Sequence, residues 1–276
     1  PLCDYYEAIA QSIEIEELIL EKWLAKPKNF GVEVDLSNVK KRAGEFSEED
    51  MEKLYSNTHI FEGLKENLAR HAKGLKTMIF CPSVASSIQV ATDLNCLHVD
   101  GSMTEKERDT ILKIFEDTPG SVITNCGITT TGYDCPSIEC IVLYRATTSL
   151  PLYLQMIGRG SRVIKDKKDS FVVLDFGMNI QRFGFWHINR KWNLNPPKRN
   201  KDKKDTFPIR ICPNCEAKLP AQVKKCEYCG YIWPVTEKER VFAELKEMSY
   251  RKIQDKAKDA TIEELEQFTT TANKHA

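Results

Sequence analysis

Hydrophobic residues between positions 60 and 180 fall into short continuous runs separated by stretches with helical spacing. The runs at 77–81, 97–100, 121–126, 140–144 and 170–176 predict strands. Helices are predicted over 60–72, near 84–94, after Thr104 and over 150–158. Buried strands without polar alternation, separated by helices, are typical of a parallel sheet covered on both faces. The pattern therefore predicts a doubly wound α/β domain with right-handed crossovers.

The first fifty residues show weaker periodicity. Residues 13–25 repeat apolar side chains at helical spacing, and Pro27 ends that pattern. Residues 32–36 alternate between apolar and polar and predict a short strand. Ser47, followed by three acidic residues, predicts the N-terminus of another helix.

Composition narrows the class of protein. The 276 residues carry 40 Lys and Arg against 40 Asp and Glu, and 41% of them are hydrophobic, as in a soluble chain with a core. No apolar run approaches the ~20 residues of a bilayer span. No signal peptide precedes the first helix, so a cytoplasmic location is expected. The stretch 190–210 holds eight Lys or Arg and two Asp, a local charge of +6, and is interpreted as a basic linker.

Four of the ten cysteines form two C-x-x-C pairs, Cys212 with Cys215 and Cys226 with Cys229. Two such pairs supply the four thiolates of a tetrahedral zinc site, and Gly230 helps the second turn to close. A redox-active dithiol is the competing interpretation. Four protein ligands leave no open position, so the zinc is predicted to be structural. The scattered placement of the other six cysteines favours a reducing compartment over a disulfide framework.

The cysteine module resembles a zinc ribbon. Two roles remain open for this module: it is either a folded spacer or a contact for nucleic acid or protein. The contact interpretation uses the neighbouring lysines and aromatic residues together with the basic linker: Lys218, Lys224, Lys225, Tyr228, Tyr231 and Trp233.

The segment from Gln155 to Arg162 carries two arginines beside glycines. If the helix continues through it, Gln155, Arg159 and Arg162 are spaced by four and three residues and share one face. Guanidinium groups are well suited to hold phosphoryl oxygens, and glycines allow a phosphate to approach closely. An arginine pair on a solvated surface is the ordinary alternative.

A second polar segment, 124–136, follows the end of a predicted strand. Ligands of open α/β sheets bind beyond the carboxyl ends of the strands. The hydroxyl-rich loop there can donate to phosphates, and Asp134 can accept from a ribose hydroxyl. An ordinary turn with Asp134 as a cap is the alternative interpretation.

Taken in order, these segments resemble the second RecA-like lobe of superfamily 2 DEAD/DEAH-type helicases, and most closely the bacterial and phage branch of DNA helicases. Residues 77–83 resemble motif IV, and 98–102 with Glu105 and Arg108 resemble motif IVa. Residues 124–136 resemble motif V. Residues 155–162 match the Q-x-x-G-R-x-x-R pattern of motif VI, the most specific of the four. The resemblance covers about residues 1–190.

The resemblance implies roles for individual residues. Arg159 and Arg162 would be arginine fingers that reach the terminal phosphate of ATP, with Gln155 setting their geometry or touching nucleic acid. Gly132 and Asp134 would approach the nucleotide. The phosphodiester backbone of the tracked strand would be contacted by four residues: Ser83, Gly101, Thr124 and Asn125. The implied cofactors are ATP and Mg²⁺ in a complete two-lobe enzyme, and the implied partner is nucleic acid, with DNA favoured over RNA.

Two elements of such a motor are absent from the sequence. No Gly is followed by Lys, as a phosphate-binding G-x-x-x-x-G-K-[ST] loop requires, and no Asp is followed by Glu, as in the acidic magnesium motif. We therefore expect this chain to be the C-terminal portion of a longer helicase. The portion by itself is expected not to hydrolyse ATP appreciably. The alternative is a non-catalytic nucleic-acid-binding or regulatory protein that retains the lobe for its shape.

The expected organisation has five parts. Residues 1–45 are expected to form the end of a first lobe and its connector, and 46–190 the RecA-like lobe. The basic linker follows over 191–209, the zinc ribbon over 210–234 and a C-terminal helical segment over 235–276.

Overall fold

The computed structural model describes residues 4–10, 13–42, 44–56, 58–127, 133–190, 192–194 and 207–234. The chain divides into two compact units, Pro1–Val223 and Lys224–Ala276. In these described parts, no helix combines the length and apolar character that a membrane crossing needs. The C-terminal helical segment expected over 235–276, and most of the basic linker, lie outside the described residues.

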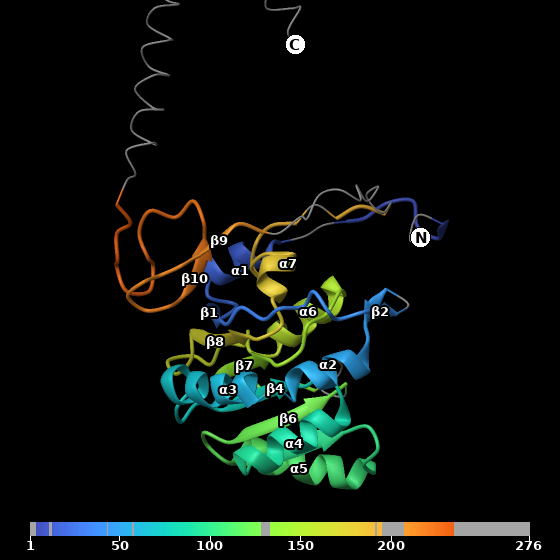
Figure 1. The fold of residues 1–276 in the computed structure, drawn as a ribbon. Coiled ribbons are helices and arrows are strands. Elements are labelled where there is room, and N and C mark those ends of the chain that lie inside the picture. The colour runs from blue at the N-terminus through green and yellow to red at the C-terminus, as the bar shows by residue number, and fades with distance from the viewer. Residues whose placement is uncertain are drawn as a thin grey trace, which may run out of the picture. The chain divides into compact units, whose positions relative to one another are not determined.

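A six-stranded sheet forms the centre of the first unit (Figure 1). Every neighbouring pair of strands is parallel, and the strand order is β1-β8-β7-β4-β6-β5. The strands are β1 (Lys26–Gly31), β4 (Thr77–Phe80), β5 (Leu97–Asp100), β6 (Val122–Cys126), β7 (Cys140–Leu143) and β8 (Ser170–Asp175). The predicted parallel α/β sheet is thus confirmed, because its continuous apolar runs are buried on both faces.

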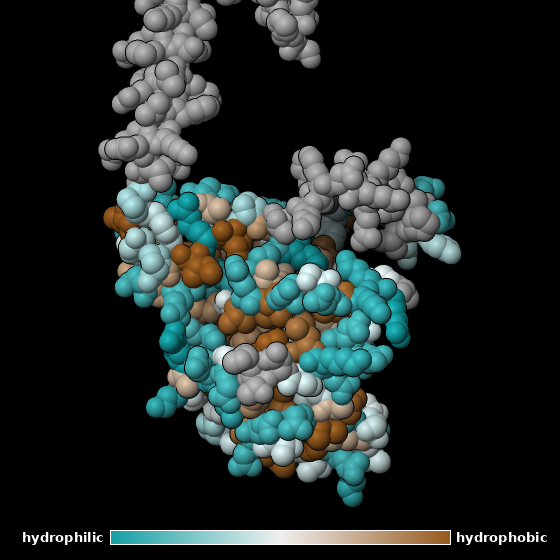
Figure 2. All heavy atoms as spheres, viewed as in Figure 1, coloured by the Kyte–Doolittle hydropathy of each residue, from teal (hydrophilic) through white to brown (hydrophobic). Residues whose placement is uncertain are grey.

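Helices cover the sheet on its two faces. One hydrophobic cluster includes Phe115 of α5 and Met156 of α6, and the other includes Met51 of α2 and Leu64 of α3. The helices are α1 (Ile15–Leu20), α2 (Glu48–Tyr55), α3 (Thr58–His71), α4 (Val84–Leu94), α5 (Glu105–Asp117), α6 (Leu150–Gly158) and α7 (Asn179–Phe183). Figure 2 shows hydrophilic residues over much of the visible surface, with hydrophobic residues grouped among them.

The N-terminal caps of the helices agree with the sequence patterns that predicted them. The Thr104 side chain accepts from the Glu107 amide and the Glu107 carboxylate reaches back, which is the predicted capping box of α5. Ser47 caps α2 as predicted, accepting from Asp50 N at 3.4 Å. Ser83 caps α4 in the same way, accepting from Ser86 N at 3.0 Å.

The first strand was predicted in the wrong place. Residues 32–36 form no strand, and β1 instead spans Lys26–Gly31, with Pro27 inside it. β1 is an edge strand and pairs with β8 only, so the missing amide of Pro27 is tolerated there. Gly31 is required where the two strands end, because a Cβ on it would lie 2.3 Å from the Asp175 carbonyl oxygen.

Two small antiparallel pairs complete the described strands. β2 (Lys41–Arg42) pairs with β3 (Glu45–Phe46). β9 (Ile209–Ile211) pairs with β10 (Lys218–Pro220) on either side of the first C-x-x-C turn.

Candidate functional site

The carboxyl ends of the parallel strands gather the four residues predicted to contact a nucleic-acid strand. Ser83 follows β4, Gly101 directly follows β5, and Thr124 and Asn125 lie in the second half of β6. Crevices beyond this edge are where open α/β sheets bind ligands. The topology thus brings together segments that are separated along the chain.

Helix α6 presents the segment that matches motif VI. Its N-cap is Ser149, which accepts from Leu152 N at 3.3 Å, and Pro151 occupies the first turn, where no amide partner is needed. The helix ends at Gly158, so Arg159 is its C-cap and Arg162 lies beyond it. The helix therefore does not continue to Arg162, and the condition under which all three residues would share one helical face is not met.

A close contact explains why the chain leaves the helix there. A Cβ on Gly160 would lie 2.4 Å from the ring of Phe171, so this position packs directly against β8. The next residues run back along the N-terminal part of the chain, where Arg162 forms an isolated antiparallel bridge with Leu24. This tertiary contact places Arg162, where the sequence argument had relied on helical spacing.

Both arginines nevertheless lie beside Asp134. Arg162 Nε donates to Asp134 Oδ1 at 3.1 Å, and the two side chains are 55% and 58% exposed. The Arg159 guanidinium donates to the carbonyl of Tyr133. Burial lowers the pKa of Arg159, and the nearby carboxylate of Asp134 opposes that shift. The predicted grouping of two guanidinium groups around Asp134 is present, built from the end of α6 and the segment that precedes β7.

The other two residues predicted for the nucleotide site, Gln155 and Gly132, form no described contact with this group. Gln155 is exposed on α6, one turn before Arg159. Gly132 lies outside the described residues.

The predicted strand-contacting residues differ in exposure. Gly101 is exposed, and Ser83 is buried at the N-terminus of α4. Thr124 and Asn125 are fully buried and donate to main-chain carbonyls, Thr124 to Ser87 at 2.9 Å and Asn125 to Ile79 at 3.0 Å. In this arrangement, the side chains of Thr124 and Asn125 hold β6 to its neighbours.

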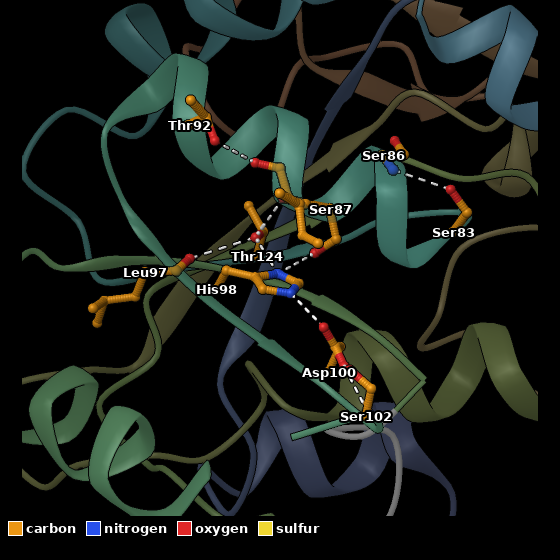
Figure 3. Close-up of polar contacts among 10 residues, drawn as sticks. Ser83, Ser86, Ser87, Thr92, Leu97, His98, Asp100, Ser102 and Thr124 are labelled. Atoms are coloured by element: carbon orange, nitrogen blue, oxygen red, sulfur yellow. Dashed lines mark hydrogen bonds and ion pairs between the residues drawn. The ribbon is translucent and has the colours of Figure 1, made fainter. Parts of the chain in front are cut away.

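His98 connects the ends of several elements at this edge (Figure 3). Its Nδ1 lies 2.9 Å from Ser87 Oγ and 3.3 Å from Thr124 Oγ1, and its Nε2 lies 2.7 Å from Asp100 Oδ2. Asp100 Oδ1 accepts from the amide and the hydroxyl of Ser102, at 2.7 and 2.6 Å. The Ser102 hydroxyl is the main reason that the pKa of Asp100 is lowered, against the effect of burial. This network fixes the turn that carries Gly101.

The same network has the composition of a Ser–His–Asp triad, but it cannot act as one. Ser87 is fully buried inside α4, so no substrate can reach its hydroxyl. Sequence analysis had assigned His98 no role in a site. A signal was present, because His98 and Asp100 are two residues apart on one strand and therefore share a face.

The four cysteines of the two C-x-x-C turns form the candidate metal centre. Their sulfur atoms all lie within 4.8 Å of one another. Zinc–sulfur bonds of about 2.3 Å in a tetrahedron require sulfur–sulfur distances of about 3.8 Å, so the donor set fits a closed zinc site. The nine described cysteines form no disulfide bonds.

The two knuckles have the same backbone plan. Glu216 N donates to Cys212 O at 2.8 Å, and Gly230 N donates to Cys226 O at 2.9 Å. The residue after each pair has a positive φ, +61° at Glu216 and +78° at Gly230. The role predicted for Gly230 is thus confirmed, whereas nothing in the sequence indicated that Glu216 would adopt the same strained conformation.

Known proteins match both parts of the chain. The family described as helicase conserved C-terminal domain matches residues 59–163, and the uncharacterised protein family UPF0547 matches residues 210–234. A 51.5 kDa protein of a Lactococcus phage (isolate 7-9) is 26% identical over 261 residues, which are 91% of this chain and 57% of the phage protein. A candidate ATP-dependent helicase of Saccharomyces cerevisiae, IRC3, is 34% identical over 172 residues, which are 59% of this chain and 25% of the yeast protein.

Among solved structures, a fragment of a candidate HsdR subunit of a type I restriction enzyme from Vibrio vulnificus has a similar fold. The TM-score is 0.55 at 20% identity, over 66% of this chain and 38% of that one. The chain thus spans little more than half of the phage relative and a quarter of the yeast relative.

Proposed function

We propose that this chain, which matches the helicase conserved C-terminal domain family over residues 59–163, is the second motor lobe of an ATP-dependent nucleic-acid helicase or translocase of superfamily 2. The observation that carries the proposal is the grouping of Arg159 and Arg162 around Asp134, in the segments that precede β8 and β7. A lobe of this kind completes its active site only when a second lobe presents the nucleotide.

In the proposed mechanism, Arg159 and Arg162 reach the terminal phosphate of ATP bound to the first lobe. The Arg162–Asp134 ion pair is exposed, and such pairs are worth only ~0–1 kcal/mol, so Arg162 can exchange the carboxylate for a phosphate at little cost. Arg159 is anchored to the carbonyl of Tyr133 and has less freedom. Gln155 and Gly132 complete the nucleotide site in this proposal. Once Arg162 has left the Asp134 carboxylate, Asp134 accepts a hydrogen bond from a ribose hydroxyl. Mg²⁺ bound with ATP would neutralise charge on the phosphates.

The carboxyl edge supplies the strand contacts in the proposal. The N-terminus of α4 at Ser83 and the exposed turn at Gly101 contact the phosphodiester backbone without reading sequence. Thr124 and Asn125 stabilise this edge, because their buried side chains bond β6 to α4 and β4. DNA is the preferred substrate through the resemblance to phage and bacterial DNA helicases.

Zinc has a structural part in this proposal. Four cysteine thiolates saturate a tetrahedral ion, so it folds the two knuckles and takes no part in ATP hydrolysis.

The test is ATP hydrolysis by the longer protein that includes an upstream lobe, measured without nucleic acid and with single-stranded DNA or RNA. We expect stimulation by nucleic acid, and a loss of about 10³-fold in kcat on Arg159→Ala, since an arginine finger contributes ~10³–10⁵. The 276-residue chain alone is expected to hydrolyse no ATP.

Two outcomes would contradict this function. Arg159-dependent turnover by the 276-residue chain alone would show that no second lobe is needed. Nucleic-acid binding by the longer protein without any ATP hydrolysis would favour the alternative of a non-catalytic binding protein that retains the lobe for its shape.

A further inference from the structure

Arg145 lies at the carboxyl edge of the sheet. It lies two residues after the end of β7, and its Nε is buried with no hydrogen-bond partner among the described residues. Arg182, by contrast, donates to the carbonyl of Thr147 at 2.8 Å. Burying an unpaired donor costs about 1–3 kcal/mol, so its presence needs a reason.

The main chain at Arg145 is held in place from one side. Asn179 Nδ2 donates to the Arg145 carbonyl at 2.9 Å and to Asp175 Oδ1 at 3.0 Å. Gly177 packs against the same carbonyl so closely that a Cβ there would lie 2.1 Å from its oxygen. The backbone of Arg145 is therefore fixed before any ligand binds.

Arg145 follows β7, the strand that pairs with β4. Register between β4 and β7 pairs Phe80 with Leu143, so Arg145 is level with the residue that precedes Ser83, the N-cap of α4. Burial raises the pKa of both the Cys81 and the Cys126 thiols, and the positive charge of Arg145 opposes both shifts. Glu48 and Asp100 also act on Cys126, but neither forms an ion pair with Arg145 in the described part of the chain.

We propose that Arg145 binds a phosphate of the nucleic-acid strand, next to the N-terminus of α4. A helix N-terminus favours anions, and a guanidinium fork matches two phosphate oxygens. The 11-residue helix α4 and Arg145 follow neighbouring strands at the same edge of the sheet, so both can act on one anion there. This inference rests on the proposed function, and it adds a charged contact that motif comparison did not assign.

The proposal has a consequence for stability that a purely structural arginine would not share. A structural arginine makes bonds inside the protein, and removing it destabilises the fold. Arg145 leaves a buried donor unsatisfied, so Arg145→Gln is expected to leave the melting temperature unchanged or to raise it.

The experiment measures binding of a fluorescent oligothymidine or oligouridine to the 276-residue chain by anisotropy, over a series of salt concentrations. Arg145→Gln is expected to weaken binding about tenfold, as for one charge-assisted hydrogen bond, and to reduce the slope of log K against log salt by about 0.7. Arg145→Lys keeps the charge but loses the fork, and is expected to lie between the two.

Lys113→Gln is the matched control. It removes one positive charge from the exposed surface in the C-terminal half of α5. Helices that cross over between parallel strands run opposite to them, so this residue lies away from the carboxyl edge. Its affinity and salt slope are expected to equal those of the wild type.

Each other outcome has a definite meaning. Unchanged affinity and salt slope in Arg145→Gln would overturn the role of Arg145 and leave the proposed function standing. A melting temperature lowered by several degrees would assign Arg145 to the fold instead. Loss of labelled-ATP binding by the longer two-lobe protein carrying Arg145→Gln, with oligonucleotide binding intact, would assign Arg145 to a nucleotide phosphate. A wild-type chain that binds neither oligonucleotide would overturn the proposed strand contacts, and Arg145 with them.

Discussion

Lys168 lies six residues after Arg162 and is 7% exposed. Its Nζ donates to the carbonyl of Pro136 at 3.0 Å, in the segment that also carries Asp134. Its main chain pairs with Ile164 in an isolated antiparallel bridge. Lys168 thus connects the turn after the arginines to the segment that those arginines contact. Burial lowers its pKa to about 8, against the nearby Glu139 and Cys135.

This lowered pKa predicts a pH dependence of stability. Between about pH 8 and 10.5, the unfolded chain keeps the proton on Lys168 and the folded chain has lost it, so the free energy of unfolding rises with pH. Below pH 8 both states hold the proton, and the cost of burying the charge is fully present. The free energy of unfolding of the wild type minus that of Lys168→Met should therefore rise by roughly 2–3 kcal/mol from pH 7 to 10.5. Urea unfolding at a series of pH values measures it, and a flat difference would refute the pKa shift.

How far single residues can be read from sequence depends on what positions them. Arg159 and Asp134 were found because motif VI and the loop after β6 are local patterns. The burial of Thr124 and Asn125 was not foreseen, because it depends on α4 and β4 packing over β6. Arg145 lies in an ordinary stretch of sequence, and only the register of β7 against β4 reveals its position.

At the scale of elements, the boundaries of α4 and α6 were predicted correctly from apolar spacing and caps. The end of α5 depends on a residue from another element. Lys76, just before β4, is 3% exposed, and its ammonium group donates to three carbonyls at the end of α5: those of Phe115, Glu116 and Thr118. A lysine at that distance in sequence gives no local signal of its partner. The misplaced first strand has a related cause, because only the pairing of β1 with β8 decides that Lys26–Gly31 is extended.

Lys76→Met is expected to lower the free energy of unfolding by about 2–4 kcal/mol, because helix-end carbonyls lose a charged donor in a buried site. Exposed Lys113→Met on α5 should change it by less than about 0.5 kcal/mol. Chemical denaturation of both variants checks this, and equal stability of the two would contradict the assigned bonds.

The cysteine module makes a prediction about metal content. One zinc per chain is expected by atomic emission, and Cys226→Ser should release it, since a buried thiolate ligand is lost. Cys96→Ser is the control. Cys96 lies just after α4 and is not one of the four clustered cysteines, so this variant should keep the metal. Full zinc retention in Cys226→Ser would show that these four sulfurs do not hold it.

At the scale of the whole molecule, the proposed function makes this lobe one side of a two-lobe cleft. The arginine pair and Asp134 come from the segments that precede β8 and β7, whereas Ser83 and Gly101 follow the carboxyl ends of β4 and β5. The sequence contains neither a phosphate-binding loop nor an acidic magnesium motif. The parallel sheet and its two helical layers were predictable, because hydrophobic patterning specifies them throughout residues 60–180. The direction in which the guanidinium groups face was not, because it depends on Gly160 packing against Phe171 and on the bridge from Arg162 to Leu24.

The most direct measurement is an experimental structure of the longer two-lobe protein with a non-hydrolysable ATP analogue and a single-stranded oligonucleotide. Arg159 or Arg162 should lie about 2.7–2.9 Å from an oxygen of the terminal phosphate, the distance of a charge-assisted hydrogen bond. A bound nucleotide with both guanidinium groups still on Tyr133 and Asp134, and out of reach of its phosphates, would contradict the account.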